Sequence, residues 1–294
     1  MAKILITGAN SFVGTNFQKF SRFCDIEEIS LIDHRPEDIN FGKYDIVLHL
    51  AAIVHQSKKI PEKDYLTINR DLSLKVAEHA KKAGIKQFVF LSTIKVYGNS
   101  GHDLKILNED SGCFPDDPYG RSKLEAEIGL KKMETSHFTI SIIRTPLVYG
   151  EGVKANMMSL IKLIEKIRVL PFKNIYNKRN FTYTENLVGF IDQIIFKKAS
   201  GVFIAMDENA ISTTDLVSFI SKYLGQNVTL FKLPQTFSTL GMHVIPGVFD
   251  RLYSSLEFDN NKTLRELDYK PPFSTEEGIK KMVLAYINRN PRFT

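Results

Sequence analysis

Cysteine is scarce in this sequence of 294 residues, and only Cys24 and Cys113 are present. Neither stands in a C-x-x-C or other metal-ligand spacing, so no metal site is predicted. Two thiols are also too few for a disulfide framework. We therefore expect a reduced, cytoplasmic setting.

Targeting and membrane segments are lacking as well. The first residues, Met-Ala-Lys-Ile-Leu-Ile-Thr-Gly, contain no apolar core of a signal peptide. The longest stretch without Asp, Glu, Lys or Arg covers residues 233–249, and prolines and glycines interrupt it at Pro234, Gly241, Pro246 and Gly247. Such a stretch is too polar and too broken to span a bilayer, and a buried or lid-like segment is expected instead.

Charge of one sign is not concentrated either. Lys and Arg exceed Asp and Glu by 39 − 33 = 6, and the densest basic stretch, 173–179, is short. Nucleic-acid binding would be better supported by a continuous basic stripe. An anionic small molecule is the partner that this balance favours.

The chain is 43% apolar and 24% charged, which excludes a disordered or fibrous protein. In the first half, strand-like and helix-like runs alternate, which predicts a parallel sheet covered on both faces. The expected strands cover 3–7, 28–32, 45–50, 87–92 and 139–144, and the helices 10–22, 61–83 and 119–134. Beyond residue 150 we expect helices at 156–168, 213–224 and 275–288, a loop that becomes helical at 182–196, and one more core strand at 201–205.

A glycine loop, Thr7-Gly8-Ala9-Asn10-Ser11-Phe12-Val13-Gly14, follows the first strand and opens the first helix. Gly8 permits the tight turn, and Gly14 lets the helix pack closely on the strand. The free N–H groups of the helix start offer an anion site for a pyrophosphate. A plain strand–helix turn is the alternative; the strand before, the helix after and an acid further on favour a dinucleotide.

That acid is Asp33, expected at the end of the second strand and 25 residues after Gly8. An acid there accepts hydrogen bonds from the adenine ribose and repels a 2′-phosphate, which favours NAD. His34 and Arg35 follow, and an arginine there can instead hold a 2′-phosphate, so NADP is not excluded.

Tyr119 and Lys123 stand four residues apart and share one face of a helix. A nearby ammonium lowers the pKa of a phenol, and a nicotinamide cation would add to this effect. A phenol tuned in this way exchanges protons with a sugar hydroxyl or ketone near neutral pH. Such a pair is common by chance, and without other evidence an ordinary surface helix face is the better explanation.

Other evidence exists, because motifs along nearly the whole chain resemble the extended short-chain dehydrogenase/reductases, in particular their nucleotide-sugar epimerase and reductase branch. They are the glycine loop, His49-Leu-Ala-Ala52, Asn69, Ser92-Thr-Ile-Lys-Val-Tyr-Gly98, Tyr119-x-x-x-Lys123 and Arg144-Thr-Pro-Leu-Val-Tyr-Gly150. The resemblance implies an α/β protein with a Rossmann-type doubly wound parallel sheet and a smaller C-terminal substrate-binding region. Residues 1–150, with later pieces at about 180–206, would form the first part, and 151–179 and 207–294 the second.

The resemblance also implies roles for single residues. Thr93 would bond the reacting sugar oxygen, Tyr119 would be the acid/base, and Lys123 would bind the nicotinamide ribose. Asn69 would be mostly structural. The expected cofactor-binding residues are Gly8, Ser11, Phe12, Val13, Gly14, Asp33, His34, Arg35, Asp38, Ile39, Leu50, Ala51, Ala52, Asn69, Leu91, Tyr119, Lys123, Pro146 and Val148. Two departures stand out: Ser11 replaces the usual middle glycine, and the short stretch 38–45 leaves little room for the usual helix.

Ile94 and Lys95 narrow the choice of reaction. In dehydratase-type members of the family, the two residues after the threonine are an acid pair that eliminates water. An apolar side chain and a cation cannot do this, so we reject a dehydratase. Three segments, 152–156, 177–186 and 255–259, resemble a bacterial subgroup of 4-ketoreductases that make UDP-N-acetylquinovosamine-type sugars. We expect reduction of a UDP-4-keto-6-deoxy-N-acetylhexosamine in polysaccharide sugar biosynthesis. A UDP-glucose or UDP-N-acetylhexosamine 4-epimerase is the alternative, and a non-catalytic dinucleotide-binding protein the distant one. The expected substrate-binding residues are Thr93, Thr145, Asn156, Arg179 and Arg251, and His55 is a further candidate beside the sugar. The resemblance also predicts a homodimer that pairs helices 61–83 and 119–134.

Overall fold

The computed structural model describes residues 2–54, 60–98, 106–232 and 252–290. Its centre is a parallel sheet of six strands in the order β2-β1-β3-β4-β5-β9. The strands are β1 (Ile4–Thr7), β2 (Ile26–Ile29), β3 (Ile46–His49), β4 (Gln87–Thr93), β5 (Thr139–Thr145) and β9 (Gly201–Ile204). The order reverses between β1 and β3, and in open α/β sheets the carboxyl ends of the strands at such a reversal form a ligand crevice. We refer to this side of the sheet as the carboxyl edge.

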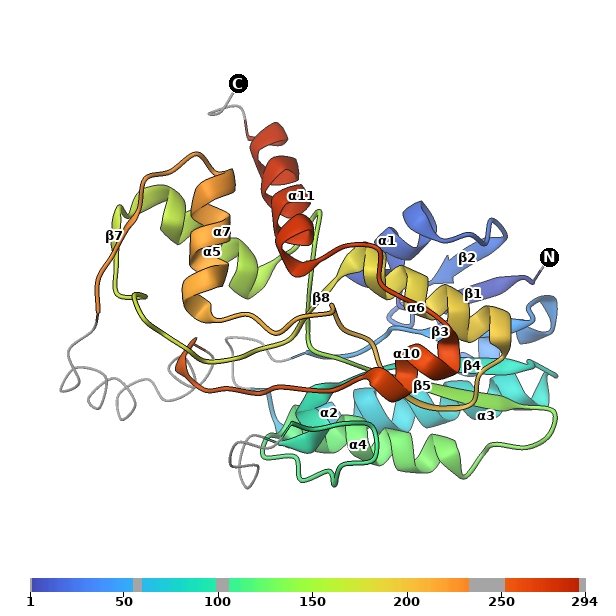
Figure 1. The fold of residues 1–294 in the computed structure, drawn as a ribbon. Helices are drawn as coiled ribbons and strands as arrows, with labels where there is room; N and C mark the ends of the chain where they lie inside the picture. Colours follow the sequence, from blue (N-terminus) through green and yellow to red (C-terminus); the bar gives the residue numbers. More distant parts are fainter. Residues whose placement is uncertain (1, 55–59, 99–105, 233–251, 291–294) are drawn as a thin grey trace.

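Helices cover both faces of the sheet, as the alternating pattern predicted (Figure 1). On one face, α1 (Phe12–Phe20) and α6 (Thr184–Lys197) share an apolar core with β1 and β3. On the other face lie α3 (Ser73–Lys82) and α4 (Pro118–Lys131). The strands β1 and β3 are buried at every position, which explains their unbroken apolar runs.

The connection from β2 to β3 contains two short 3₁₀ turns, η1 (Pro36–Asp38) and η2 (Phe41–Lys43), and no α-helix. The expected loss of a helix in this stretch is confirmed. The expected end of the second strand is wrong, because β2 stops at Ile29, four residues before Asp33. The reason is local: the Ser30 hydroxyl accepts from the Ile32 N–H and the Ser30 carbonyl from the His34 N–H, which turns the chain away from the sheet.

The helix predicted at 61–83 is continuous but not uniform. It begins as α2 (Glu62–Tyr65), passes through a π-helical turn η3 (Leu66–Leu72) and continues as α3. It ends before Gly84, whose φ of +85° is the left-handed conformation that a helix end often needs. The π-helical turn has no signal in the apolar spacing, whereas its buried Asn69 is a residue that the motifs singled out.

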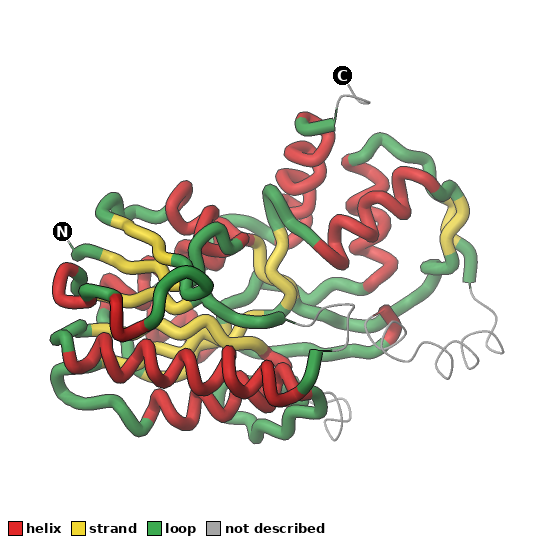
Figure 2. Tube along the Cα trace, turned by 180° about the vertical axis from the view of Figure 1, so that it is seen from behind, coloured by secondary structure: helices red, strands yellow, loops and turns green. Residues whose placement is uncertain are grey.

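The smaller region has its own apolar core, built by α5 (Ala155–Lys166), α7 (Thr213–Tyr223) and α11 (Thr275–Asn288). Figure 2 shows these helices standing at one end of the sheet. Short strand pairs accompany them: β6 (Leu147–Tyr149) with β8 (Phe181–Tyr183), and β7 (Val169–Leu170) with β10 (Thr229–Leu230). The segment expected to be loop-like from 182 therefore begins as a strand. A helix that the sequence did not predict, α10 (Asn261–Leu267), packs on α6.

Within the described residues, none of the helices has the length and apolar character that a bilayer crossing requires.

Candidate active site

The glycine loop lies in the crevice between β1 and β3. Gly8 has a φ of +117°, and a Cβ atom there would stand 2.7 Å from the Ala51 nitrogen. The Gly8 and Ala9 N–H groups both donate to the Ile29 carbonyl at the end of β2. Only glycine fits this turn, and the predicted cofactor residues Gly8 and Ala51 are brought into contact.

Ser11 is the N-cap of α1, and its hydroxyl accepts from the Gly14 N–H at 3.1 Å. This capping bond gives Ser11 a structural reason to replace the usual glycine. The other N–H groups of the first turn, from Phe12 and Val13, have no acceptor within the helix. Both N–H groups are therefore available to donate to an anion at the carboxyl edge. Three other cofactor candidates belong to the apolar core that α1 and α6 share with the sheet, namely Leu50, Leu91 and Val148.

The acidic side chain that touches the glycine loop is Glu28, which sequence reasoning missed. Its Oε2 accepts from the Asn10 N–H at 3.3 Å. Asp33, expected to bond the adenine ribose, is exposed in the turn after β2, as are His34 and Arg35, and its role stays a prediction. Asp38 is exposed at the end of η1, while Ile39 packs against the apolar core beside α3 and α4. The register of β1 with β2 was the missing signal, since it pairs Ile6 with Glu28.

Thr93 and Thr145 end β4 and β5 and lie opposite each other in the sheet, so both reach the carboxyl edge. Tyr119 stands in the first turn of α4, near enough to Thr93 for this residue to lower the pKa of its phenol. The Thr145 hydroxyl donates to the Ser92 carbonyl at 3.4 Å. The structure thus brings together the three side chains that the motifs assigned to the substrate oxygen and its neighbourhood.

Lys123 lies one helical turn beyond Tyr119, is only 1% exposed, and its Nζ stands 3.8 Å from the centre of the Phe90 ring. Burial lowers the pKa of Lys123 to about 7, and Glu127 opposes this shift. Within the described part of the chain, the Lys123 ammonium has no hydrogen-bond acceptor or ion-pair partner. A buried ammonium in this state is suited to hold the hydroxyls of a bound ligand.

The expected direction of the Tyr119 shift is not what the structure gives. Burial raises the pKa of the phenol above its ordinary value, the Asp117 carboxylate and Tyr65 raise it further, and only Thr93 opposes them. The reason is that desolvation of the phenolate is the largest effect. Lys123 is itself desolvated, and its charge does not reverse the balance.

A buried ion pair stabilises the position of the helix that carries Tyr119 and Lys123. Arg144 on β5 holds Glu127 on α4 through a contact of 2.6 Å from Nη2 to Oε2, and their side chains are 4% and 1% exposed. Glu127 also accepts from the Ser92 hydroxyl, and Arg144 donates to the Tyr97 phenol at 2.7 Å. The pair fastens α4 to the ends of β4 and β5, next to Thr93 and Lys123.

Asn69 ties the π-helical turn to its neighbours, which agrees with the expected structural role. Its side chain pairs with both backbone groups of Ile53, at 2.8 and 3.0 Å, and donates to the Ser122 hydroxyl at 3.0 Å. Ser122 directly precedes Lys123. The network therefore connects the chain after β3 with the helix that carries Tyr119 and Lys123.

His49 forms a second buried network beneath the glycine loop. Ser73 donates to the Asn69 carbonyl, so its oxygen accepts from the His49 Nε2–H at 2.9 Å. His49 Nδ1 then accepts from the Thr7 hydroxyl at 2.7 Å. Burial lowers the pKa of His49 to about 3, so the ring is neutral and its role is to position the loop.

The remaining substrate candidates belong to the smaller region. Asn156 is exposed at the start of α5. The Arg179 backbone pairs with Ile211, and its Nε donates to the Ser254 carbonyl at 2.8 Å. Two of the expected cofactor-binding residues lie outside this region: Pro146 connects β5 with β6, and Ala52 follows Ala51 beyond β3. Arg251 and His55 lie outside the described residues.

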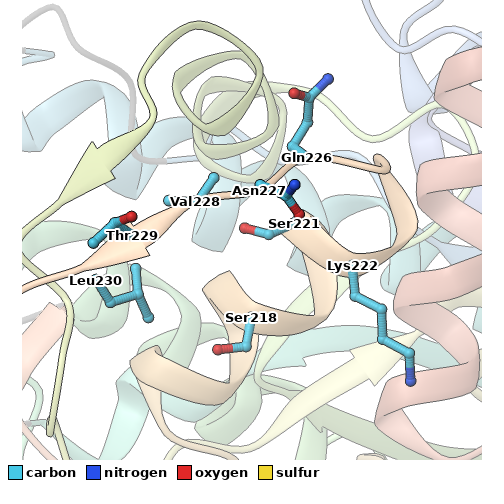
Figure 3. A pocket seen from close by; sticks show the side chains of 8 residues that line it. All are labelled: Ser218, Ser221, Lys222, Gln226, Asn227, Val228, Thr229 and Leu230. Carbon is cyan, nitrogen blue, oxygen red and sulfur yellow. The ribbon is translucent and has the colours of Figure 1, made fainter.

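A hollow of about 340 Å³ between the end of α7 and β10 offers no comparable chemistry (Figure 3). Its two serine hydroxyls donate to helix carbonyls, Ser218 to Thr214 and Ser221 to Val217. Lys222 pairs with Glu276 at 2.8 Å. These three polar side chains are thus engaged elsewhere, and the carboxyl edge is the candidate site.

A doubly wound sheet with a glycine loop at its reversal point, and with threonine, tyrosine and lysine at the same edge, defines a dinucleotide-dependent enzyme of the short-chain dehydrogenase/reductase class. Residues 4–204 match the model of the NAD-dependent epimerase/dehydratase family. The chain is 32% identical to a UDP-glucose 4-epimerase from Vibrio cholerae, over 98% of this chain and 97% of the relative. It belongs to the NAD-dependent epimerase/dehydratase family and is an NAD-dependent enzyme.

Solved structures share the fold. A UDP-glucuronic acid 4-epimerase from Bacillus cereus in complex with NAD aligns with a TM-score of 0.75 at 21% identity, over 96% of this chain and 98% of that one. A dTDP-4-dehydrorhamnose reductase from Bacillus anthracis in complex with NADP aligns with a TM-score of 0.76 at 20% identity, over 97% and 99%. The same fold thus serves an epimerase and a reductase, so it does not distinguish between the two reactions.

Proposed function

We propose that this enzyme transfers a hydride at C4 of a UDP-sugar, and that it is a 4-ketoreductase acting on a UDP-4-keto-6-deoxy-N-acetylhexosamine. The observation that carries the proposal is the meeting of Thr93, Tyr119 and Lys123 at the carboxyl edge. A hydroxyl, a phenol and a buried ammonium there match the groups that carbonyl reduction requires.

The glycine loop fits the dinucleotide. Gly8 has no side chain and its backbone lies against Ala51, so a pyrophosphate can come close to the backbone of the loop. The first turn of α1 presents N–H groups to that pyrophosphate. The buried Lys123 ammonium suits the hydroxyls of the nicotinamide ribose. When bound, the nicotinamide supplies the hydride; the protein residues orient the sugar and handle the proton.

The proton step assigns one task to each side chain. As C4 of the ketosugar accepts the hydride, its oxygen takes the proton of the Tyr119 phenol. Thr93 donates a hydrogen bond to the same oxygen and fixes its position. The phenolate that forms is stabilised by the positive charge of Lys123, one turn along α4.

The UDP group belongs to the smaller region in this proposal. Arg179 offers a guanidinium for the diphosphate, Asn156 an amide, and the net charge of +6 favours an anionic substrate. Arg251 is a second proposed phosphate contact. Thr145, buried beside Thr93, faces the sugar.

A UDP-glucose or UDP-N-acetylhexosamine 4-epimerase is the second candidate, and the relative from Vibrio cholerae favours it. Both reactions use the same three side chains. They differ in whether the coenzyme leaves after one hydride transfer and in whether the ketosugar intermediate can flip within the site to present its other face.

The deciding experiment incubates the enzyme with NADH or NADPH and a UDP-4-keto-6-deoxy-N-acetylhexosamine, and follows the absorbance of the reduced nicotinamide. Consumption equal to the sugar added, over many turnovers, supports the reductase. Consumption of one equivalent per enzyme molecule or less, with conversion of a UDP-N-acetylhexosamine into its C4 epimer, supports the epimerase. Unchanged turnover of Tyr119→Phe would overturn the assignment of the site.

We also infer a homodimer that pairs the helix 62–82 with α4. Ile128 on α4 is 48% exposed and stands among the residues available for such a contact. A monomeric mass in light scattering would contradict this pairing.

A further inference from the structure

Lys95 has no task in the proposed reaction, although it lies two residues after Thr93. It belongs to η4 (Ile94–Tyr97), a short turn that leaves the carboxyl edge. Its N–H donates to the Thr93 hydroxyl oxygen at 3.3 Å. Its carbonyl oxygen stands 2.5 Å from the place where a Cβ of Gly120 would be, so η4 and the first turn of α4 are in direct contact.

The side chain of Lys95 makes a second connection to α4. Its ammonium forms an ion pair with the Asp117 carboxylate, and the two side chains are 37% and 22% exposed. Asp117 is the N-cap of α4, and its other carboxylate oxygen accepts from the Gly120 N–H at 2.6 Å. One carboxylate therefore begins the helix that carries Tyr119 and also binds the residue whose N–H donates to the Thr93 hydroxyl.

We propose that Lys95 is a positioning residue that acts through Asp117: their ion pair holds Tyr119 against Thr93 and screens the phenol from the Asp117 carboxylate. This inference rests on the proposed role of Tyr119 as the acid/base.

The charges around Tyr119 give the expected direction. Thr93 approaches from β4, and Tyr65 from α2, with the two tyrosine rings 6.3 Å apart. Along α4, Asp117 and Lys123 stand on either side. Asp117 raises the pKa of both Tyr119 and Tyr65. Removal of the Lys95 ammonium takes away a positive charge that offsets this carboxylate, so the pKa of Tyr119 should rise further.

The test compares four variants with the wild type. Lys95→Met should move the apparent pKa of Tyr119 in the pH profile of kcat upward by roughly one unit. Lys95→Arg keeps the charge and should restore the wild-type profile. Asp117→Asn keeps the capping oxygen and should move the pKa downward. Lys95→Met combined with Asp117→Asn should return it towards the wild-type value, which a merely structural role would not predict.

Lys86→Met is the matched control. Lys86 pairs with Asp45 at 2.8 Å and directly precedes β4, at the opposite end of the strand from Thr93. It loses the same charge from a comparable pair, and its pH profile should equal that of the wild type.

A titration of tyrosinate absorbance, taken as the difference between each protein and the same protein with Tyr119→Phe, measures the ionisation of Tyr119 without turnover. A wild-type value in Lys95→Met, by this titration and by kcat, would overturn the inference. If no substrate turns over, the proposed function fails, while the titration still decides the role of Lys95. If Lys95→Met does not fold, Lys95→Gln takes its place in the titration, and an unchanged pKa there would refute the screening.

Discussion

The ion pair of Arg144 and Glu127 should carry a large share of the stability of this enzyme, and Arg144→Met tests it. Glu127 is 1% exposed, and three contacts from Arg144, at 2.6, 3.2 and 3.2 Å, compensate its charge. The substitution keeps an apolar side chain of similar length. It leaves the carboxylate buried with the Ser92 hydroxyl as its remaining bonded partner among the described contacts.

Breaking one side of a buried pair costs about 3–5 kcal/mol, because the other charge stays behind in a medium of low polarity. The entropy of unfolding is about 2 cal/mol/K per residue, or roughly 0.6 kcal/mol/K for a chain of this length. We therefore expect the melting temperature of Arg144→Met to fall by about 5–8 °C. The assay is thermal unfolding followed by circular dichroism at pH 7.5.

The double variant Arg144→Met, Glu127→Leu provides the internal control. It removes both charges, so no buried ion remains, and it should recover most of the lost stability. Lys86→Met, at an exposed pair, should change the free energy of unfolding by less than about 1 kcal/mol. A double variant no more stable than Arg144→Met would refute the argument, since the loss would then come from packing and not from an uncompensated charge.

Three further predictions concern the carboxyl edge. Lys123→Met should lower turnover at least about 100-fold, yet raise the melting temperature at pH 7. Burial lowers the pKa of Lys123 to about 7, against about 10.4 in the unfolded chain. The gain in melting temperature should therefore shrink as the pH rises from 7 to 10. Gly8→Ala should cost about 1–3 kcal/mol and weaken NADH binding in a fluorescence titration, since its Cβ would press on Ala51 at φ +117°; unchanged binding would contradict the tight crevice. Glu28→Gln should raise the ratio of kcat/KM for NADPH over NADH more than Asp33→Asn does, because Glu28 touches the glycine loop; a larger effect of Asp33→Asn would support the assignment made from the sequence.

Most of the sheet could be predicted from the sequence because its strands are buried on both faces and read as unbroken apolar runs. The exception is instructive. The strand β2 carries Glu27 and Glu28 and lies at the edge of the sheet, so its apolar signal is weak and was placed too late in the chain. A hydroxyl that bonds its own backbone, Ser30, ended the strand at a point that no periodicity marks.

The candidate site divides in the same way. Thr93, Tyr119 and Lys123 belong to motifs with fixed spacing, and a parallel sheet necessarily brings strand ends such as Thr93 and Thr145 to one edge. The partners of these residues come from distant segments. Arg144 and Glu127 meet across 17 positions, and Lys95 and Asp117 across 22, so only the packed structure shows that they form pairs.

Arg144, Lys95 and Lys123 lie near the carboxyl edge, and the structure uses each of these cations differently. Arg144 is committed to Glu127, and Lys95 to Asp117. Within the described residues, Lys123 has no carboxylate in contact, and it is buried over an aromatic ring that cannot accept its proton. A buried ammonium without a partner destabilises the fold. The arrangement is therefore best explained by a ligand: the two paired cations hold α4 in place, and the third is left to bind what enters the crevice.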